Sequence, residues 1–220
     1  MLPLPTLTAQ ADRLIALGVH EIAGLSPVEL CAAAGAGPRE GALLVVHPDL
    51  APASRLAGLV ERAGKRGFVV ADLTDVDAFA PIEPLPAGPV HVVDGVDRGD
   101  EMGNWSPDEA LPAITGRGRT PLTLTEGIHW LLQQPGALER NHCFMTIGSR
   151  LRKPDGRLDA RTPALWLSNG TGHDCRERKN APKVGWCWAG NRHTWLGFAS
   201  AAGRAAVPSV LPAAPAAAAG

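Results

Sequence analysis

The 220-residue chain lacks the short motifs typical of common enzymes and cofactor sites. It has no GxGxxG, no GxxxxGK[ST] and no GxSxG, which argues against Rossmann dinucleotide binding, P-loop chemistry and α/β-hydrolase activity. Its uninterrupted apolar runs are only a few residues long, far from the roughly 20 residues that a membrane-spanning helix needs. We therefore expect a globular protein with no membrane partner, no cofactor and no recognisable catalytic signature.

Export signals and paired cysteines are also missing. Met1 is followed by Leu-Pro-Leu-Pro, without the basic and apolar regions of a signal peptide. The four cysteines, Cys31, Cys143, Cys175 and Cys187, form no CxxC pair. We expect a cytoplasmic protein whose thiols are reduced.

The near-neutral net charge of −1 hides an uneven distribution of charges along the chain. Residues 1–115 carry 7 basic and 16 acidic side chains, a net charge of −9. Residues 116–220 carry 14 basic and 6 acidic side chains, a net charge of +8. This asymmetry predicts either that the two halves dock on one another or that the second presents a basic face to a partner.

Helix caps and apolar runs predict a mixed N-terminal layer. Ser26, Ser106 and Thr123 are each followed three residues later by Glu, the pattern of a capping box at a helix start. Buried strands are indicated by the β-branched apolar runs at 42–46, 67–71 and 90–93. A helix expected over 52–63 lies between the first two runs, which favours a βαβ crossover with flanking helices.

The C-terminal half is predicted to be an antiparallel sheet of about four strands, with helix 124–132 packed on it. Its strands are expected at 142–151, 164–168, 183–188 and 193–200. The fold class is therefore α+β. We expect one unit over 1–205, made of an acidic half (residues 1–115) and a basic half (residues 116–205), followed by a disordered Ala/Pro tail at 206–220.

The densest chemical pattern is the segment 182–205, which holds Trp186, Trp188 and Trp195 around Gly190-Asn191. A two-residue Gly-Asn loop favours a hairpin between 183–188 and 193–200. In that register the three indoles and His193 share one face, because side chains alternate along a strand. A helix from Thr194 to Gly203 is the alternative, and it would abolish this pairing.

The tryptophan face has two interpretations. In the first, helix 124–132 with Trp130 covers it as part of the core. In the second, the rings form a pocket that stacks a planar group. Asn191, Arg192 and Arg150 would then hold the polar edge of the ligand, and His193 is the candidate catalytic residue.

Metal and nucleophile patterns are weaker. Asp94, Asp97 and Asp100 follow a predicted strand and form a weak magnesium candidate. Zinc-like spacing occurs only in His173-Asp174-Cys175. A Cys143–His193 nucleophilic pair is the remaining alternative, since Cys187 would lie on the opposite face from His193.

Several longer segments together resemble a family of actinobacterial proteins catalogued only as a domain of unknown function. They are LGVHEIAGLS (17–26), VDRGDEMGNWSPDEALPAI (96–114), RTPLTLTEGIHWLL (119–132), NHCFMTIGSR (141–150), PALWLSNG (163–170) and PKVGWCWAGNRHTWLGFASAAGR (182–204). The resemblance covers nearly the whole chain and implies a bacterial, cytoplasmic, single-unit protein. It brings no established activity and no assigned catalytic residues.

Three functions follow as hypotheses. The first is a protein, or an enzyme, that binds a small planar or polar ligand in a pocket lined by Trp, His and Arg. The second is a nucleic-acid or ribonucleoprotein-binding module that uses the basic half. The third is a protein-interaction or regulatory module. The sequence favours the small-molecule ligand as partner and leaves the reaction and the oligomeric state open.

Overall fold

The computed structural model describes residues 3–35 and 40–207 of the chain. The α-helices are α1 (Leu7–Ala16), α2 (Val19–Ala23), α3 (Pro27–Ala34), α4 (Ala53–Leu56), α5 (Pro107–Gly116) and α6 (Leu124–Gln133). The 3-10 helices are η1 (Ala57–Leu59), η2 (Val76–Ala78), η3 (Asp100–Met102), η4 (Pro135–Ala137), η5 (Gly172–Asp174) and η6 (Arg176–Arg178). Helices and strands are both well represented, so the α+β fold class is confirmed.

Two sheets organise the strands. The smaller sheet has the order β1 (Leu43–Val46), β6 (Val90–Asp94), β14 (Gly203–Ala206). The larger has the order β12 (Leu196–Phe198), β8 (Cys143–Met145), β10 (Arg161–Leu167), β11 (Pro182–Trp188), β4 (Phe68–Val69). Three short pairs complete the structure: β2 (Glu61–Arg62) with β3 (Lys65–Arg66), β5 (Ala80–Pro81) with β9 (Ser149–Arg150), and β7 (Thr120–Pro121) with β13 (Ser200–Ala201).

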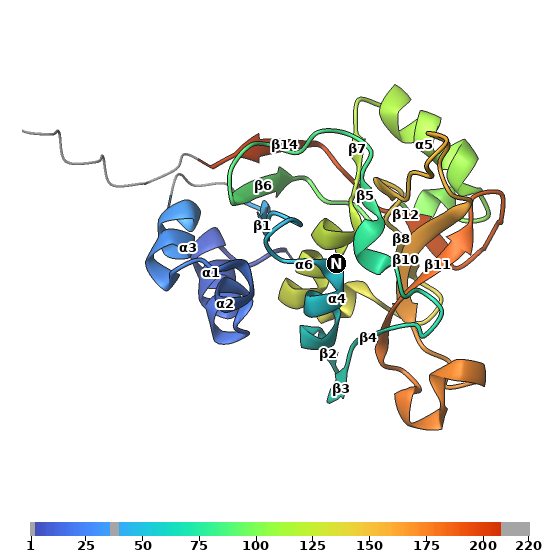
Figure 1. The fold of residues 1–220 in the computed structure, drawn as a ribbon, viewed down its shortest axis with the longest axis horizontal. Helices are drawn as coiled ribbons and strands as arrows, with labels where there is room; N and C mark the ends of the chain where they lie inside the picture. Colours follow the sequence, from blue (N-terminus) through green and yellow to red (C-terminus); the bar gives the residue numbers. More distant parts are fainter. Residues whose placement is uncertain (1–2, 36–39, 208–220) are drawn as a thin grey trace, which may run out of the picture.

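Helix α6 lies between the two sheets, and α1–α3 cluster at one end of the molecule beside the smaller sheet (Figure 1). All ten residues of α6 are buried. Its Gly127 lets it approach the larger sheet closely: a Cβ there would come within 2.6 Å of Thr146 Cγ2 and 2.8 Å of Leu165 Cδ1. The prediction that this helix packs on the C-terminal sheet is therefore confirmed.

The three capped helix starts are also confirmed. The side chains of Ser26, Ser106 and Thr123 each accept a hydrogen bond from the backbone N–H three residues on, and the Glu there accepts the backbone N–H of the cap. Each box satisfies N–H groups that the first helical turn leaves without a partner inside the helix.

The predicted βαβ crossover is wrong. β1 and β6 pair antiparallel, with Leu43 opposite Val93, and β4 joins the other sheet beside β11. The expected helix over 52–63 ends at Leu59, and a β2–β3 turn follows. The runs 42–46 and 90–93 are buried as predicted, whereas 67–71 is only half-buried and its Ala71 is exposed. Burial on both faces does not by itself require parallel neighbours.

The C-terminal sheet has five strands and is mixed rather than antiparallel, because β12 pairs parallel to β8 and β4 parallel to β11. The predicted hairpin about Gly190-Asn191 is wrong. β11 pairs antiparallel with β10 along seven residues, and β12 pairs with β8 instead. The residues after Thr194 form short strands, so the alternative of a helix there is wrong as well.

Both sheets combine strands from both halves of the chain. β14, near the end of the chain, completes the sheet of β1 and β6, and β4 from the acidic half completes the larger sheet. Ala206, expected in a disordered tail, belongs to β14, whereas residues 208–220 lie outside the described residues. Within the described ranges, no helix has the length and apolar character needed to cross a bilayer.

Candidate functional site

The tryptophan rings of the C-terminal segment separate into two groups, so the predicted single face does not form. Trp186 and Trp188 contact each other edge to face on β11, with ring centroids 4.6 Å apart. Trp195 instead contacts Trp166 of β10 at 6.2 Å and His193 at 5.3 Å. The reason is the strand order, because β8 and β10 lie between β12 and β11.

Trp166 and Trp195 line a surface pocket of about 160 Å³. The strand pairing gives their positions. Leu196 is opposite Cys143, and continuing the pairing of Leu165 with Phe144 places Trp166 opposite Cys143 on the other side of β8. Trp195 directly precedes Leu196, and its ring lies edge to face with that of Trp166. The remaining lining residues are Arg140, Asn141, Cys143, Leu167 and Asn169.

Gly185 allows the Trp166 ring to lie across the neighbouring strand. A Cβ at position 185 would collide with the ring atoms of Trp166, which occupy the space above this glycine. The Lys183 ammonium lies 5.0 Å from the Trp166 ring centroid, a cation–π contact. Its Nζ also donates a hydrogen bond to Asp174 over 2.6 Å. Trp166 is thus held by its surroundings before any ligand binds.

Polar groups surround the pocket on one side. The Arg140 guanidinium donates to the Asn169 side-chain oxygen over 3.1 Å and also to that of Asn180. Because both amide oxygens accept from Arg140, the NH₂ groups of the two amides are directed away from it and remain as donors. Asn141, also in the lining, adopts a left-handed backbone conformation with φ of 67°. The rim therefore combines a guanidinium with amide side chains.

Cys143 forms part of the pocket lining but is a poor nucleophile. Its side chain is buried, and burial raises the pKa of the thiol to about 11. The Sγ donates to the Glu139 carbonyl over 3.3 Å. At neutral pH the thiol is protonated, whereas nucleophilic attack requires the thiolate. The buried, protonated thiol thus does not favour a Cys143–His193 nucleophilic pair.

His193 lies beside Trp195, and burial lowers the pKa of its imidazole. Its Nε2 is buried and has no hydrogen-bond partner among the described residues. A catalytic role for His193 stays a prediction.

The other predicted ligand contacts are used elsewhere. Arg150 is buried in β9, where its Nη2 donates to the Asp159 carbonyl over 2.8 Å. Arg192 forms an ion pair with Glu109 and donates to the Asn104 carbonyl. Asn191 is exposed, and its backbone N–H donates to the Trp188 carbonyl. None of these three residues is part of the pocket lining.

The predicted acidic metal candidates do not converge on a cation site. Asp100 binds Arg98 with both carboxylate oxygens, at 2.7 and 2.6 Å, and Asp97 accepts the Gly99 N–H. Asp94 ends β6. Asp174, in the zinc-like triplet, is bonded to Lys183 and Ser168. Within the described residues, no group of three or more His, Cys, Asp or Glu side chains is arranged to hold a metal ion.

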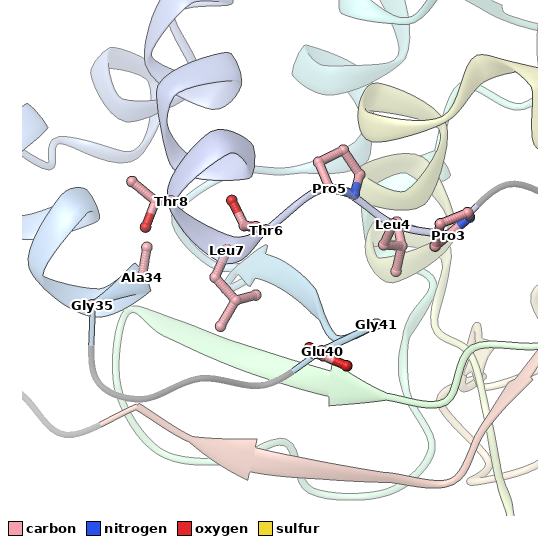
Figure 2. Close-up of a pocket in the computed structure, with 10 residues that line it drawn as sticks. All are labelled: Pro3, Leu4, Pro5, Thr6, Leu7, Thr8, Ala34, Gly35, Glu40 and Gly41. Carbon is pink, nitrogen blue, oxygen red and sulfur yellow. The ribbon is translucent and has the colours of Figure 1, made fainter.

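A second pocket, of about 540 Å³, lies at the other end of the molecule. Figure 2 shows residues 3–8 facing Ala34 and Gly35 at the end of α3 and Glu40–Gly41 before β1. Glu40 carries the one charged side chain among its described lining residues, and the Thr6 hydroxyl caps α1. The described part of its lining therefore lacks the convergent polar groups expected of a specific binding site.

Sequence reasoning missed the residues that complete the smaller pocket, namely Trp166, Arg140, Asn141 and Asn169. One signal was available for Trp166. The predicted strand 164–168 contains this large ring, and Gly185 lies in another predicted strand where a side chain would otherwise be expected. The pairing of those strands was needed to connect the two observations.

Comparison with known proteins gives one match. The model of a family described as a family of unknown function, DUF5701, matches residues 13–207. No curated protein and no solved structure matches the chain.

Proposed function

The chain belongs to the DUF5701 family, and from the geometry of its site we propose that the Trp166–Trp195 pocket binds a small neutral or anionic ligand with one flat ring. The observation that carries this proposal is the contact between two indoles in one pocket, whose lining also includes Cys143, Arg140 and Asn169. Binding pockets commonly combine apolar or aromatic walls with a few polar groups that orient the ligand.

The volume of the pocket limits the ligand to a single ring. A closed apolar cavity of about 150 Å³ holds one benzene molecule, and this pocket measures about 160 Å³. A pyrimidine, a pyridine or a small aromatic acid therefore suits it, whereas a fused ring system would extend into solvent.

Charge selects against cations. The lining contains no carboxylate, and Arg140 lies at the rim while the Lys183 ammonium occupies a position over the Trp166 ring. A quaternary amine, which two indoles would otherwise favour, meets the Arg140 guanidinium here and finds one side of the Trp166 ring already occupied by Lys183. A carbonyl or carboxylate instead finds donors in Arg140 and in the amides of Asn141 and Asn169.

We propose binding rather than catalysis, because the thiol in the described pocket lining, that of Cys143, is buried, donates to the Glu139 carbonyl and is protonated at neutral pH. We also propose the cytoplasmic location and the actinobacterial origin expected from the sequence. The four cysteines are all free thiols, which supports a reducing compartment.

Intrinsic tryptophan fluorescence tests the proposal. Nicotinate, nicotinamide and uracil are titrated into the protein, with tetramethylammonium as the cationic probe. We expect at least one ring compound, but not tetramethylammonium, to change the emission in a saturable way. Trp195→Leu should weaken binding about tenfold or more, since stacking on an aromatic side chain contributes about 1–3 kcal/mol.

Trp188→Leu is the matched control. Trp188 is 48% exposed and contacts Trp186 rather than the pocket rings, so its loss should leave the affinity unchanged. Equal weakening by both substitutions, or a saturable response to tetramethylammonium alone, would contradict the proposal.

A further inference from the structure

A group of basic side chains without ion pairs to the described residues lies next to the pocket. The segments 61–66 and 176–179 and residue 140 carry seven cations and two carboxylates, a net charge of +5 in a chain whose total is −1. None of the seven forms an ion pair within the described residues. We call these seven cations the basic surface.

Direct contacts join these segments. Lys65 Nζ donates to the Glu177 carbonyl over 2.8 Å, which attaches the β2–β3 turn to η6. The Arg178 guanidinium lies 4.3 Å from the ring centroid of Phe68 in β4. Figure 1 shows the β2–β3 turn and the segment between β10 and β11 at the same end of the molecule.

Arg140 belongs to both the basic surface and the pocket. It lines the pocket and hydrogen bonds to Asn169 and Asn180, which flank the segment containing η5 and η6. The ring pocket therefore opens beside the unpaired cations.

The basic face expected from the sequence is divided by this arrangement. Arg157, Lys153 and Arg161, which follow β9, form ion pairs with Asp155, Asp159 and Asp75. The unpaired cations gather elsewhere and include three from the acidic half of the chain, Arg62, Lys65 and Arg66. Charge counted along the sequence thus included Arg140, Arg176, Arg178 and Lys179 but did not separate them from the ion-paired cations or include those of residues 61–66.

We propose that the basic surface binds the phosphate backbone of a single-stranded nucleic acid, with one pyrimidine base in the Trp166–Trp195 pocket. This inference rests on the proposed function, because the pocket supplies the base site. Proteins that bind single strands combine a cationic track with aromatic rings on which bases stack. A single strand brings a base together with each phosphate, whereas a run of acidic side chains matches the charge without supplying a ring.

The test measures fluorescence anisotropy of a labelled 12-residue oligouridylate at increasing salt. Contacts to about four phosphates predict an affinity loss of about 50-fold between about 50 and 200 mM salt. The triple variant Arg66→Gln, Arg176→Gln, Lys179→Gln should bind more weakly and lower the slope of log Kd against log salt by about 2. The control triple Arg55→Gln, Arg152→Gln, Lys153→Gln changes the net charge equally outside the surface and should behave like the native protein.

Two outcomes overturn the inference. The first is that the oligouridylate does not bind, or that both triple variants weaken its binding equally. The second is binding of polyglutamate as tight as that of the oligouridylate, which would identify the surface as one for acidic proteins. In either case, the proposed function would stand if free uracil binds the native protein and Trp195→Leu abolishes that binding.

The failure of the pocket has a different signature. Here the triple variant weakens oligouridylate binding while Trp195→Leu leaves it unchanged. That result would show that no base enters the pocket. If, in addition, none of the free ring compounds changes the tryptophan emission, the proposed function is overturned. The part of the inference that places a base in the pocket then fails with it.

Discussion

His129 is fully buried in α6, where both of its ring nitrogens make hydrogen bonds. Nδ1 lies 2.9 Å from the Thr125 carbonyl, to which it donates, and the Val46 N–H donates to Nε2 over 3.2 Å. A protonated imidazole has no lone pair for Val46, so this arrangement requires the neutral ring. Burial lowers the pKa of His129 to about 4.

The neutral His129 predicts acid sensitivity. Below an unfolded-state pKa of about 6.5, the unfolded chain takes up a proton that the folded chain refuses until about pH 4. The free energy of unfolding should therefore fall with pH in this window, by about 2 kcal/mol between pH 7 and 4.5 from this group. Urea unfolding at both pH values measures the change. His129→Gln should remove this pH dependence, whereas the control variant His173→Gln, at an exposed site, should retain it. An unchanged pH dependence in His129→Gln would show that His129 is not its source.

Helix starts that depend on residues close together in the sequence could be predicted. Strand pairings that depend on residues far apart in the sequence could not. The cap at Thr123 lies three residues from Glu126, so the start of α6 could be read directly. The partner of β11 is instead chosen between β10 and β12 by burial and register. Gly190-Asn191 permits a tight turn, but a favourable turn does not outweigh the seven paired residues that β10 offers.

In the candidate site, too, the residue marked by its own sequence neighbours was predicted and those brought in by strand pairing were not. Trp195 was singled out because it lies in a dense tryptophan segment, and it does line the pocket. Its partner Trp166 was missed because the two meet only when β8 lies between their strands. Asn169 and Arg140 reach the rim from loops, where no sequence periodicity marks them.

Gly127 gives a test of how α6 packs. Gly127→Ala would normally favour a helix by up to about 1 kcal/mol, but here the new methyl group meets Thr146 and Leu165 in the buried interface. Overpacking of this kind typically costs about 1–3 kcal/mol, so we expect net destabilisation in urea unfolding. Gly116→Ala at the end of α5 is the control, because a Cβ there has no neighbour within 4 Å and should be tolerated. If the Gly127→Ala variant has the same free energy of unfolding as the Gly116→Ala variant, α6 does not approach the larger sheet as closely as described.

For the whole molecule, the central connection is a buried polar cluster at the junction of α6 and the smaller sheet. Arg204 of β14 donates to both carboxylate oxygens of Glu126, at 2.6 and 2.8 Å, and His91 Nε2 lies 3.1 Å from the same carboxylate. Burial alone would raise the pKa of Glu126, but the hydrogen bonds from Arg204 and His91 lower it to about 2. The cluster joins β14 to the helix that separates the two sheets.

Because strands from both halves of the chain share each sheet, we predict that the two halves unfold together. Arg204→Met leaves the Glu126 carboxylate buried without its cation, which should cost about 3–5 kcal/mol. Arg192→Met, which breaks the exposed ion pair with Glu109, should cost far less, because exposed ion pairs contribute little to stability. Urea unfolding followed by tryptophan fluorescence and by far-ultraviolet circular dichroism should give coincident curves that Arg204→Met shifts together. Separated curves would show two independently unfolding halves, and equal costs of the two substitutions would show that the buried pair does not hold them together.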